Sequence, residues 1–124
     1  MQLTNRQILD AQPALGKLLN TSLPVKQAYR IKKTLESIKK QALFVDDQRK
    51  DLIKEYGGEK EDGNYEIPVE AKESRDKFFK AYEEILDMQE DIDVRKLTLE
   101  DLEHIEITAN ELDTIEFIID TTEA

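Results

Sequence analysis

Residues 24–58 read PVKQAYRIKKTLESIKKQALFVDDQRKDLIKEYGG, and their apolar side chains recur in alternating steps of three and four residues. The positions that follow this spacing are Ala28, Ile31, Leu35, Ile38, Ala42, Val45 and Leu52, and only Arg49 departs from it. Such a seam is typical of a coiled coil. Glycine commonly follows the end of a helix, so Gly57 predicts one helix from Pro24 to about Tyr56, roughly 50 Å long at 1.5 Å per residue. A helix of this length needs a partner.

The partner is predicted in residues 69–90. The same spacing continues there through Ala71, Ser74, Phe78, Ala81, Ile85, Met88 and, just beyond, Ile92. The connection between the two helices contains an Asp62-Gly63 turn followed by Tyr65-Glu66-Ile67, which predicts a short β-arm at the tip. Together these segments predict a long antiparallel helical hairpin that resembles a coiled coil.

A shorter helix is predicted before the hairpin, from Thr4 to about Asn20. Thr4 and Gln7 have the spacing of a capping box, in which each side chain satisfies a backbone amide of the other residue. Pro13 lies inside this segment and lacks an amide donor. We therefore expect a kink or a break near Gln12.

The helical spacing changes after residue 93. Residues 94–99 and 105–107 are expected to be extended, with a helical turn at 98–101 between them. Thr108 and Glu111 form a second capping box, which opens a last helix. The apolar side of that helix consists of Leu112, Ile115, Phe117, Ile118 and Ile119.

The predicted fold is therefore mainly α. A long antiparallel hairpin carries a kinked N-terminal helix and a small C-terminal strand pair plus helix. Residues 1–93 are assigned to the hairpin and the N-terminal helix, and residues 94–124 to a small acidic α+β unit packed on them, as one compact domain. Residues 121–124 are expected to be a frayed end.

The charge is asymmetric along the chain. The 28 acidic and 18 basic side chains give a net charge of -10. Residues 1–56 hold 11 basic and 6 acidic side chains, whereas residues 57–124 hold 7 and 22. One interpretation places the basic start of the long helix against the acidic end of its partner helix. The other is that the surplus carboxylates of residues 81–124 form a surface for a basic partner.

Residues that could carry catalysis are scarce. The chain has no cysteine, which excludes disulfides, a thiolate zinc site and a thiol nucleophile. The single histidine, His104, has neither a nucleophile motif nor zinc-ligand spacing near it, and the Asp62-Gly63 turn lacks the ligands of a calcium loop. We expect no enzymatic activity, no metal and no cofactor. A weak metal-dependent activity at His104 is the alternative that calorimetry with metal ions would test.

The sequence contains no recognisable membrane signal. No apolar run approaches the roughly 20 residues of a membrane span. The first residues, MQLTNRQILD, lack the basic-then-apolar order of a signal peptide. A cytoplasmic location is the expectation.

Nucleic acid is a weaker candidate partner than protein. Lys26, Arg30, Lys33 and Lys40 follow roughly helical spacing around Tyr29, a pattern that could track phosphates. The net charge of -10 opposes direct binding of this kind. The reverse relation is an alternative, in which rows of carboxylates imitate phosphates and occupy a DNA-binding protein.

Both ends of the chain resemble a known family. Residues 3–29, LTNRQILDAQPALGKLLNTSLPVKQAY, and residues 99–120, LEDLEHIEITANELDTIEFIID, are similar to small bacteriophage proteins of unknown function from phages of Gram-positive bacteria. The resemblance covers about half of the chain and brings no catalytic motif with it. It implies a phage gene product that works in the cytoplasm of the host cell.

The expected function is non-enzymatic binding of a protein. A small phage factor would inhibit or redirect a host protein, including a defence protein, through its acidic C-terminal surface. The side chains predicted to contact the partner are Glu103, Glu106, Glu111, Asp113, Glu116 and Asp120. The alternatives are a phage assembly chaperone or virion component that self-associates through its hairpins, and the DNA-mimic inhibitor described above.

Overall fold

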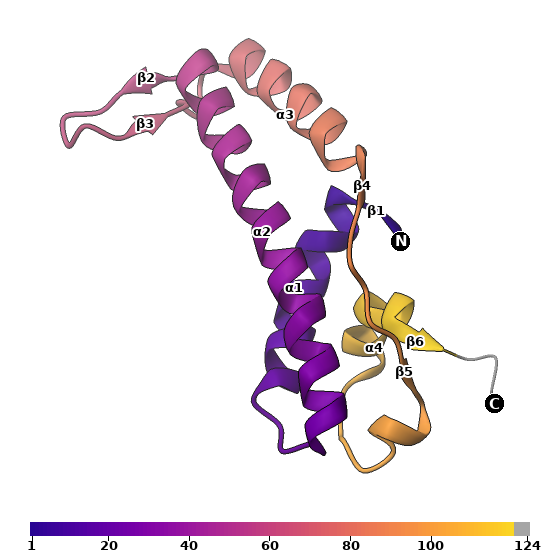
Figure 1. The fold of residues 1–124 in the computed structure, drawn as a ribbon. Helices are drawn as coiled ribbons and strands as arrows, with labels where there is room; N and C mark the ends of the chain where they lie inside the picture. The colour runs from indigo at the N-terminus through magenta and orange to yellow at the C-terminus, as the bar shows by residue number, and fades with distance from the viewer. Residues whose placement is uncertain (121–124) are drawn as a thin grey trace.

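The computed structural model describes residues 1–120, and the frayed end predicted at residues 121–124 lies outside this range. The chain is mainly helical, as predicted, and the strands of the described range form three separate two-stranded sheets. Figure 1 shows a long helical hairpin rising from a body that holds the N-terminal helix and the C-terminal unit.

The long helix α2 (Val25–Tyr56) matches its prediction at both ends. Its buried residues are Ile31, Thr34, Leu35, Ile38, Ala42 and Val45, and all except Thr34 belong to the predicted seam. Beyond Val45 no side chain of α2 is fully buried. The last turns of the helix therefore stand outside the core.

The first helix, α1 (Asn5–Leu19), begins at the predicted capping box. The Gln7 amide donates to Thr4 Oγ1 at 3.1 Å, and the Thr4 amide donates to Gln7 Oε1 at 2.8 Å. The helix continues through Pro13, so the chain does not break near Gln12. Pro13 itself is exposed, so its ring lies on the solvent side of the helix and not in the core.

The third helix ends earlier than predicted. Helix α3 spans Lys72–Leu86, and strand β4 (Gln89–Asp91) then pairs antiparallel with strand β1 (Gln2–Thr4), which the sequence did not predict. Met88 is consequently exposed, and Ile92 reaches the core from the segment that follows β4, outside any helix or strand. Pairing with β1 satisfies the backbone groups of both short strands, and this tertiary gain overrides the helical spacing of residues 69–90.

The buried side chain of Asn5 marks the point where α3 stops. The Asn5 amide donates to the Met88 carbonyl at 3.0 Å, and its Nδ2 donates to the Ile85 carbonyl at 2.8 Å. Its Oδ1 accepts from Gln41 Nε2 at 3.1 Å. Carbonyls at the end of α3 thus find the outside donors that a helix end requires. The helix therefore ends against α1 at the level of Gln41, halfway along α2.

The predicted pairing of the basic start of α2 with the acidic end of α3 is wrong. Helix α3 has 15 residues and α2 has 32, so α3 does not reach the first turns of α2. Within residues 1–120 no ion pair joins the two helices. The start of α2 lies instead beside the C-terminal unit, where Gln27 Nε2 donates to Asp101 Oδ1 at 2.9 Å.

The C-terminal unit contains β5 (Leu97–Thr98), the 3-10 turn η1 (Glu100–Leu102), α4 (Ala109–Ile115), the 3-10 turn η2 (Glu116–Ile118) and β6 (Ile119–Asp120). The turn near 98–101 and the capping box at Thr108 are as predicted. A strand pair is also present, but β5 pairs in parallel with β6, whereas residues 105–107 form no strand. The last helix is shorter than predicted because extended backbone at Ile119 buries this side chain and pairs with β5.

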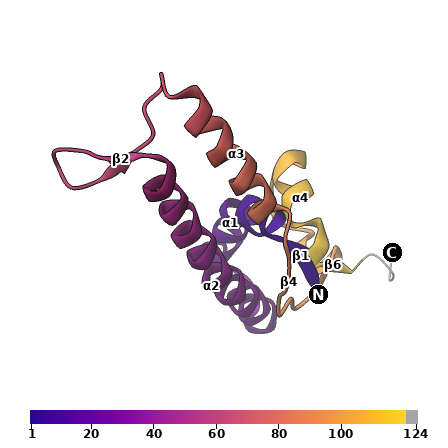
Figure 2. The ribbon, with the colours of Figure 1, turned by 90° about the horizontal axis from the view of Figure 1, so that it is seen from above.

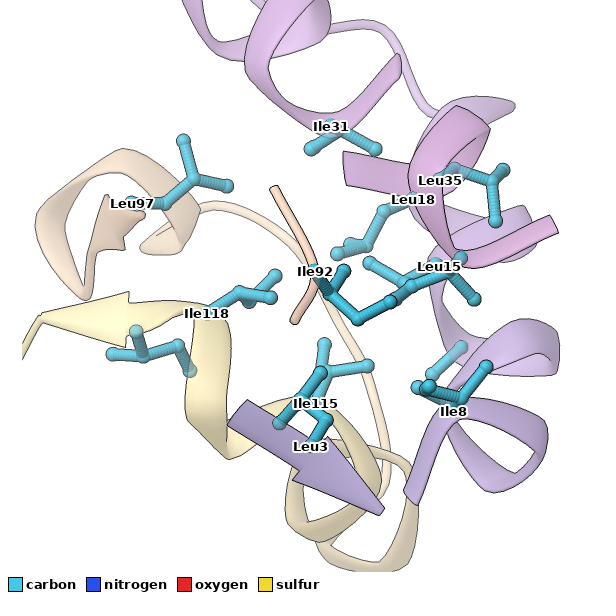
Figure 3. Close-up of a cluster of buried hydrophobic side chains, with 14 of the residues drawn as sticks. Leu3, Ile8, Leu15, Leu18, Ile31, Leu35, Ile92, Leu97, Ile115 and Ile118 are labelled. Atoms are coloured by element: carbon cyan, nitrogen blue, oxygen red, sulfur yellow. The ribbon is translucent and has the colours of Figure 1, made fainter. Parts of the chain in front are cut away.

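The core lies between α1, the first half of α2 and the C-terminal unit, as Figure 3 shows. Its fully buried side chains include Ile8, Leu15, Ile31, Leu97 and Ile115. These residues come from both sides of residue 93, so the N-terminal and C-terminal parts of the chain share one core.

Residues 43–88 form an arm that projects from this core (Figures 1 and 2). The arm consists of the second half of α2, the predicted β-arm made by β2 (Gly58–Glu59) and β3 (Tyr65–Glu66), and α3. No residue of the arm belongs to the core cluster. Its own buried apolar side chains are Val45, Phe78 and Leu86.

Candidate functional site

The tip of the arm holds two adjoining hollows, which we call the arm-tip groove. The first has a volume of about 220 Å³ and is lined by Ile53, Tyr65, Glu66, Ile67, Arg75, Phe78 and Phe79. The second has a volume of about 470 Å³ and is lined by Arg49, Lys50, Ile53, Lys54, Gly63, Asn64 and Tyr65. Ile53 and Tyr65 belong to both, so the two hollows lie on either side of these residues.

A tight turn positions Tyr65 at the groove. Gly63 has a φ of +84°, a conformation that glycine adopts without strain. Just before it, Asp62 Oδ1 accepts from the Asn64 amide at 3.0 Å, which is the local hydrogen bond typical of aspartate in turns. The turn reverses the chain so that Tyr65 on β3 returns toward the end of α2.

Gly57 fixes the β-arm to the end of α2. Its amide donates to the Ile53 carbonyl at 2.8 Å. A Cβ at this position would collide with the backbone of Glu66 and with the Ile53 carbonyl. The absence of a side chain at Gly57 therefore lets β3 pass close to the helix end.

Aromatic rings form the wall of the first hollow on α3. Phe78 is buried, and its ring stacks on Tyr82 with 5.7 Å between centroids. Phe79 contacts Phe78 edge to face at 5.3 Å but is 48% exposed. The Arg75 guanidinium lies 5.7 Å from the centre of the Phe79 ring. The hollow is thus apolar inside, with a cation at its edge.

The second hollow has a basic rim. Lys54 Nζ lies 5.5 Å from the centre of the Tyr65 ring. Arg49 and Lys50 both pair with Asp46, at 3.0 Å and 3.1 Å. The pKa of Asp46 is lowered, mainly by the hydrogen bond from Lys50 and to a smaller extent by the hydrogen bond from Arg49. Asp46 therefore stays ionised and holds both cations beside the groove.

Exposed apolar side chains gather on the arm. The large ones are Leu43, Phe44, Tyr65, Val69, Phe79 and Met88. Of these residues, Tyr65 and Phe79 also line the arm-tip groove. The sequence did not predict the groove, because its walls come from three separate segments. The available signal was Tyr65-Glu66-Ile67, an apolar pair inside an otherwise polar connection.

Comparisons with protein families, with curated proteins and with solved structures found no match to this chain. The relationship of its two ends to a phage family therefore stays a prediction. What the groove binds has to be inferred from the chemistry of its own side chains.

The six acidic residues predicted to contact a partner have different environments. Glu103, Glu106, Asp113 and Glu116 are exposed. Glu111 is half-buried, because it caps α4 through Thr108 and pairs with Lys17 Nζ at 3.2 Å. The pKa of Glu111 is lowered, mainly by the hydrogen bond from the Thr108 amide and to a smaller extent by the hydrogen bond from Lys17.

The remaining predicted residue, Asp120, is half-buried on β6 opposite Thr98. Asp113 lines a hollow of about 320 Å³ between α1 and α4, and the other residues around it are Gln7, Asp10, Thr114 and Phe117. The structure thus adds Asp10, from the opposite end of the sequence, to the acidic surface. It also assigns Glu111 a structural role.

The structure adds two observations to the search for chemistry. His104 is exposed on the loop that follows η1. In the part of the chain that is described, no three His, Cys, Asp or Glu side chains lie close enough together to hold a metal ion.

Among residues 1–120, none of the helices has the length and apolar character needed to cross a membrane.

Proposed function

We propose that this protein is a non-enzymatic protein-binding factor and that the arm-tip groove is its main contact. The observation that carries this proposal is the apolar hollow between Ile53, Ile67 and Phe79, with the Arg75 cation at its edge, on an arm that also exposes several large apolar side chains. A concave apolar site with a few charged groups is the usual form of a binding site. The resemblance of the two ends to phage proteins would make the partner a host or phage protein in the bacterial cytoplasm.

The chemistry of the groove favours a particular partner segment. An aromatic or aliphatic side chain would fill the first hollow and contribute about 1.5–3 kcal/mol by burial. Arg75 at the edge of the first hollow and Lys54 in the adjoining second hollow would pair with carboxylates of the partner, since Glu66, the acidic residue that lines the first hollow, already pairs with Lys60 at 3.1 Å. We therefore expect a segment with one apolar anchor flanked by acidic residues.

Capture of partners from a bacterial lysate, with mass spectrometry of the retained proteins, tests the groove. Phe79→Ser removes one wall of the first hollow and should reduce retention of the partner about ten-fold, as expected for an anchor pocket. Leu19→Ser changes an equally exposed side chain on α1 and should leave retention unchanged. Equal retention by the two variants, or no protein retained by the wild type, would contradict the proposal.

The charged rim can be tested separately. Lys54→Gln combined with Arg75→Gln should weaken binding of the captured partner, and added salt should affect this variant less than the wild type. Lys72→Gln, at the exposed start of α3, is the matched control. Binding that is unchanged in the double variant would rule out the acidic flanks and leave only the apolar anchor.

The acidic surface is the second candidate. The hollow between Asp10 and Asp113 would accept a lysine or arginine side chain of a basic partner, which includes a DNA-binding protein. Asp113→Asn with Glu116→Gln should then abolish capture, while Phe79→Ser should not. This opposite pattern in the same assay separates the two surfaces.

Self-association through the arms is the third candidate, and it would suit an assembly chaperone or a virion component. The same exposed residues, among them Phe44 and Phe79, would then be buried against a second copy. Light scattering would show a defined oligomer, and Phe79→Ser would convert it to monomer. A wild-type monomer at high concentration would eliminate this alternative.

A further inference from the structure

Another hollow lies at the opposite end of α2 from the arm-tip groove. It has a volume of about 380 Å³ and is lined by Val25, Lys26, Tyr29, Arg30 and Arg95. Three of these five residues are cationic and none is acidic. Every charged residue that lines this hollow is thus cationic, although the chain as a whole has a net charge of -10.

Specific hydrogen bonds bring Arg95 to this place. The Arg95 amide donates to Thr34 Oγ1 at 2.9 Å, and the Asp93 amide donates to Ser37 Oγ at 3.1 Å. Arg30 Nη1 donates to the Lys96 carbonyl at 3.5 Å. Thr34 is buried, so its hydroxyl fixes residues 93–96 across α2. The position of Arg95 beside Arg30 is thus a consequence of the fold.

Two cations contact the Tyr29 ring: Arg95, which lines the hollow, and Lys33, which does not. Lys33 Nζ and the Arg95 guanidinium each lie 5.5 Å from its centre. Each contact is favourable because the face of an aromatic ring carries negative potential. The three cations that line the hollow, Lys26, Arg30 and Arg95, repel one another, and an anion between them would relieve that repulsion.

The carboxylates near the hollow already have partners. Glu36 pairs with Lys33 at 3.5 Å, and Asp93 pairs with Arg95 at 3.6 Å. Asp101 accepts from the Thr98 amide and from Gln27, both at 2.9 Å. Within residues 1–120 neither Lys26 nor Lys96 has an ion-pair partner within 4 Å, so the cationic charge around the hollow exceeds the acidic charge.

We propose that this hollow binds a phosphate monoester, held by Lys26, Arg30 and Arg95. A phosphate carries a charge of about -1.5 to -2 at neutral pH and presents three acceptor oxygens, which suits three cations. Guanidinium groups bind phosphate through two parallel hydrogen bonds, so two arginines favour it over a single carboxylate.

The same observations disfavour a nucleic-acid strand. Proteins that bind single strands offer free aromatic faces on which bases stack. The Tyr29 ring is already in contact with Lys33 and Arg95. The net charge of -10 also repels a polyanion, whereas a single phosphate group responds mainly to the local cations.

The test is a titration of ¹⁵N-labelled protein with O-phosphoserine, monitored by amide chemical shifts at constant ionic strength. Saturable shifts are expected at residues 25–30 and 94–96. Arg95→Gln should weaken binding about ten-fold through the loss of a charge-assisted contact, and Arg30→Gln should act similarly. Lys40→Gln, on the same helix outside the hollow, should bind like the wild type.

Three results would overturn the assignment. The first is shifts that rise linearly without saturation, and the second is equal weakening in Lys40→Gln and Arg95→Gln. The third is a short single-stranded oligonucleotide that binds more tightly than O-phosphoserine at the same ionic strength. Inorganic phosphate as a second probe distinguishes the sources, because equal affinity for both probes indicates free phosphate as the ligand and not an ester.

Discussion

Asn5 shows how much one polar side chain contributes to this fold. It is 1% exposed and bonds to the end of α3 and to the middle of α2 from the first residue of α1. A buried polar group is stable only when its hydrogen bonds are made. Here the Ile85 carbonyl of α3 and the Gln41 side-chain amide of α2 both bond to the side-chain amide of Asn5. A capping pair and a core residue can be predicted from the neighbouring sequence, but this connection spans 80 residues and leaves no local pattern.

Asn5→Ala should therefore be strongly destabilising. The Ile85 carbonyl and the Gln41 amide would lose their partner, which costs about 2–3 kcal/mol in the free energy of unfolding. Urea denaturation followed by circular dichroism measures this quantity. Asn110→Ala, at an exposed position on α4, should change it by less than about 0.5 kcal/mol. Equal losses in the two variants would show that the three-helix connection is unimportant.

Glu111 should make stability depend on pH. Its pKa in the folded chain is lowered from the ordinary value of 4.5. The stability that it contributes is thus fully present above pH 4.5 and is lost as the pH falls through the folded-state pKa. Glu111→Gln keeps an acceptor for the Thr108 amide but removes the charge.

In Glu111→Gln, the unfolding midpoint should fall less than in the wild type when the pH is lowered from 5 to about 2. Thermal melts at several pH values measure the difference. Glu106→Gln, at an exposed position on the loop before α4, serves as the control and should follow the wild-type curve. Superimposable curves for Glu111→Gln and the wild type would contradict the role assigned to this carboxylate.

At the scale of elements, structure encoded by neighbouring residues was predictable, whereas the pairing of strands that are distant in the sequence was not. Helix α2 and both capping boxes follow from spacing and from residues three positions apart. The β-arm follows from its turn. In contrast, the pairs β1–β4 and β5–β6 join strands of two or three residues that are distant in the sequence, and strands so short carry no alternation. The end of α3 was missed for the same reason, because it depends on β1.

Gly57→Ala tests how the β-arm is joined to α2. The new Cβ would collide with the Glu66 backbone and displace β3. We expect proteolysis within residues 58–67 to accelerate about ten-fold, while the unfolding midpoint of the core changes little. Gly58→Ala is the matched control, since nothing lies within 4 Å of a Cβ at that position. Equal proteolysis rates in the two variants would show that the close approach at Gly57 does not hold the arm.

At the scale of the whole molecule, the core and the proposed binding groove lie in separate parts of the chain. The core cluster contains no residue of the arm, and the arm-tip groove contains no residue of the core. The charge of the sequence predicted a contact surface in the acidic C-terminal third, but much of that unit is also needed to complete the core through Leu97, Ile115 and Ile118. The groove could be identified only from the three-dimensional structure, because its walls come from segments that are separate in the sequence.

Replacement of residues 58–66 by a short Gly/Ser linker tests this separation. The free energy of unfolding should change by less than about 1 kcal/mol, because no core contact is removed. Retention of the partner in the capture assay should be lost. Urea denaturation provides the first measurement, and loss of a cooperative transition would show that the arm is part of the folding unit.

The continuity of α2 has a geometric consequence for any partner that engages both ends of the molecule. Arg30, in the hollow proposed to bind phosphate, and Ile53, in the arm-tip groove, lie on the same uninterrupted helix. At 1.5 Å per residue, they are about 35 Å apart. An extended chain covers at most about 3.3–3.6 Å per residue, so roughly ten residues must separate a phosphorylated side chain from an apolar anchor before one peptide can occupy both sites. The length of helix α2 would then select partners by the number of residues between the phosphorylated side chain and the apolar anchor.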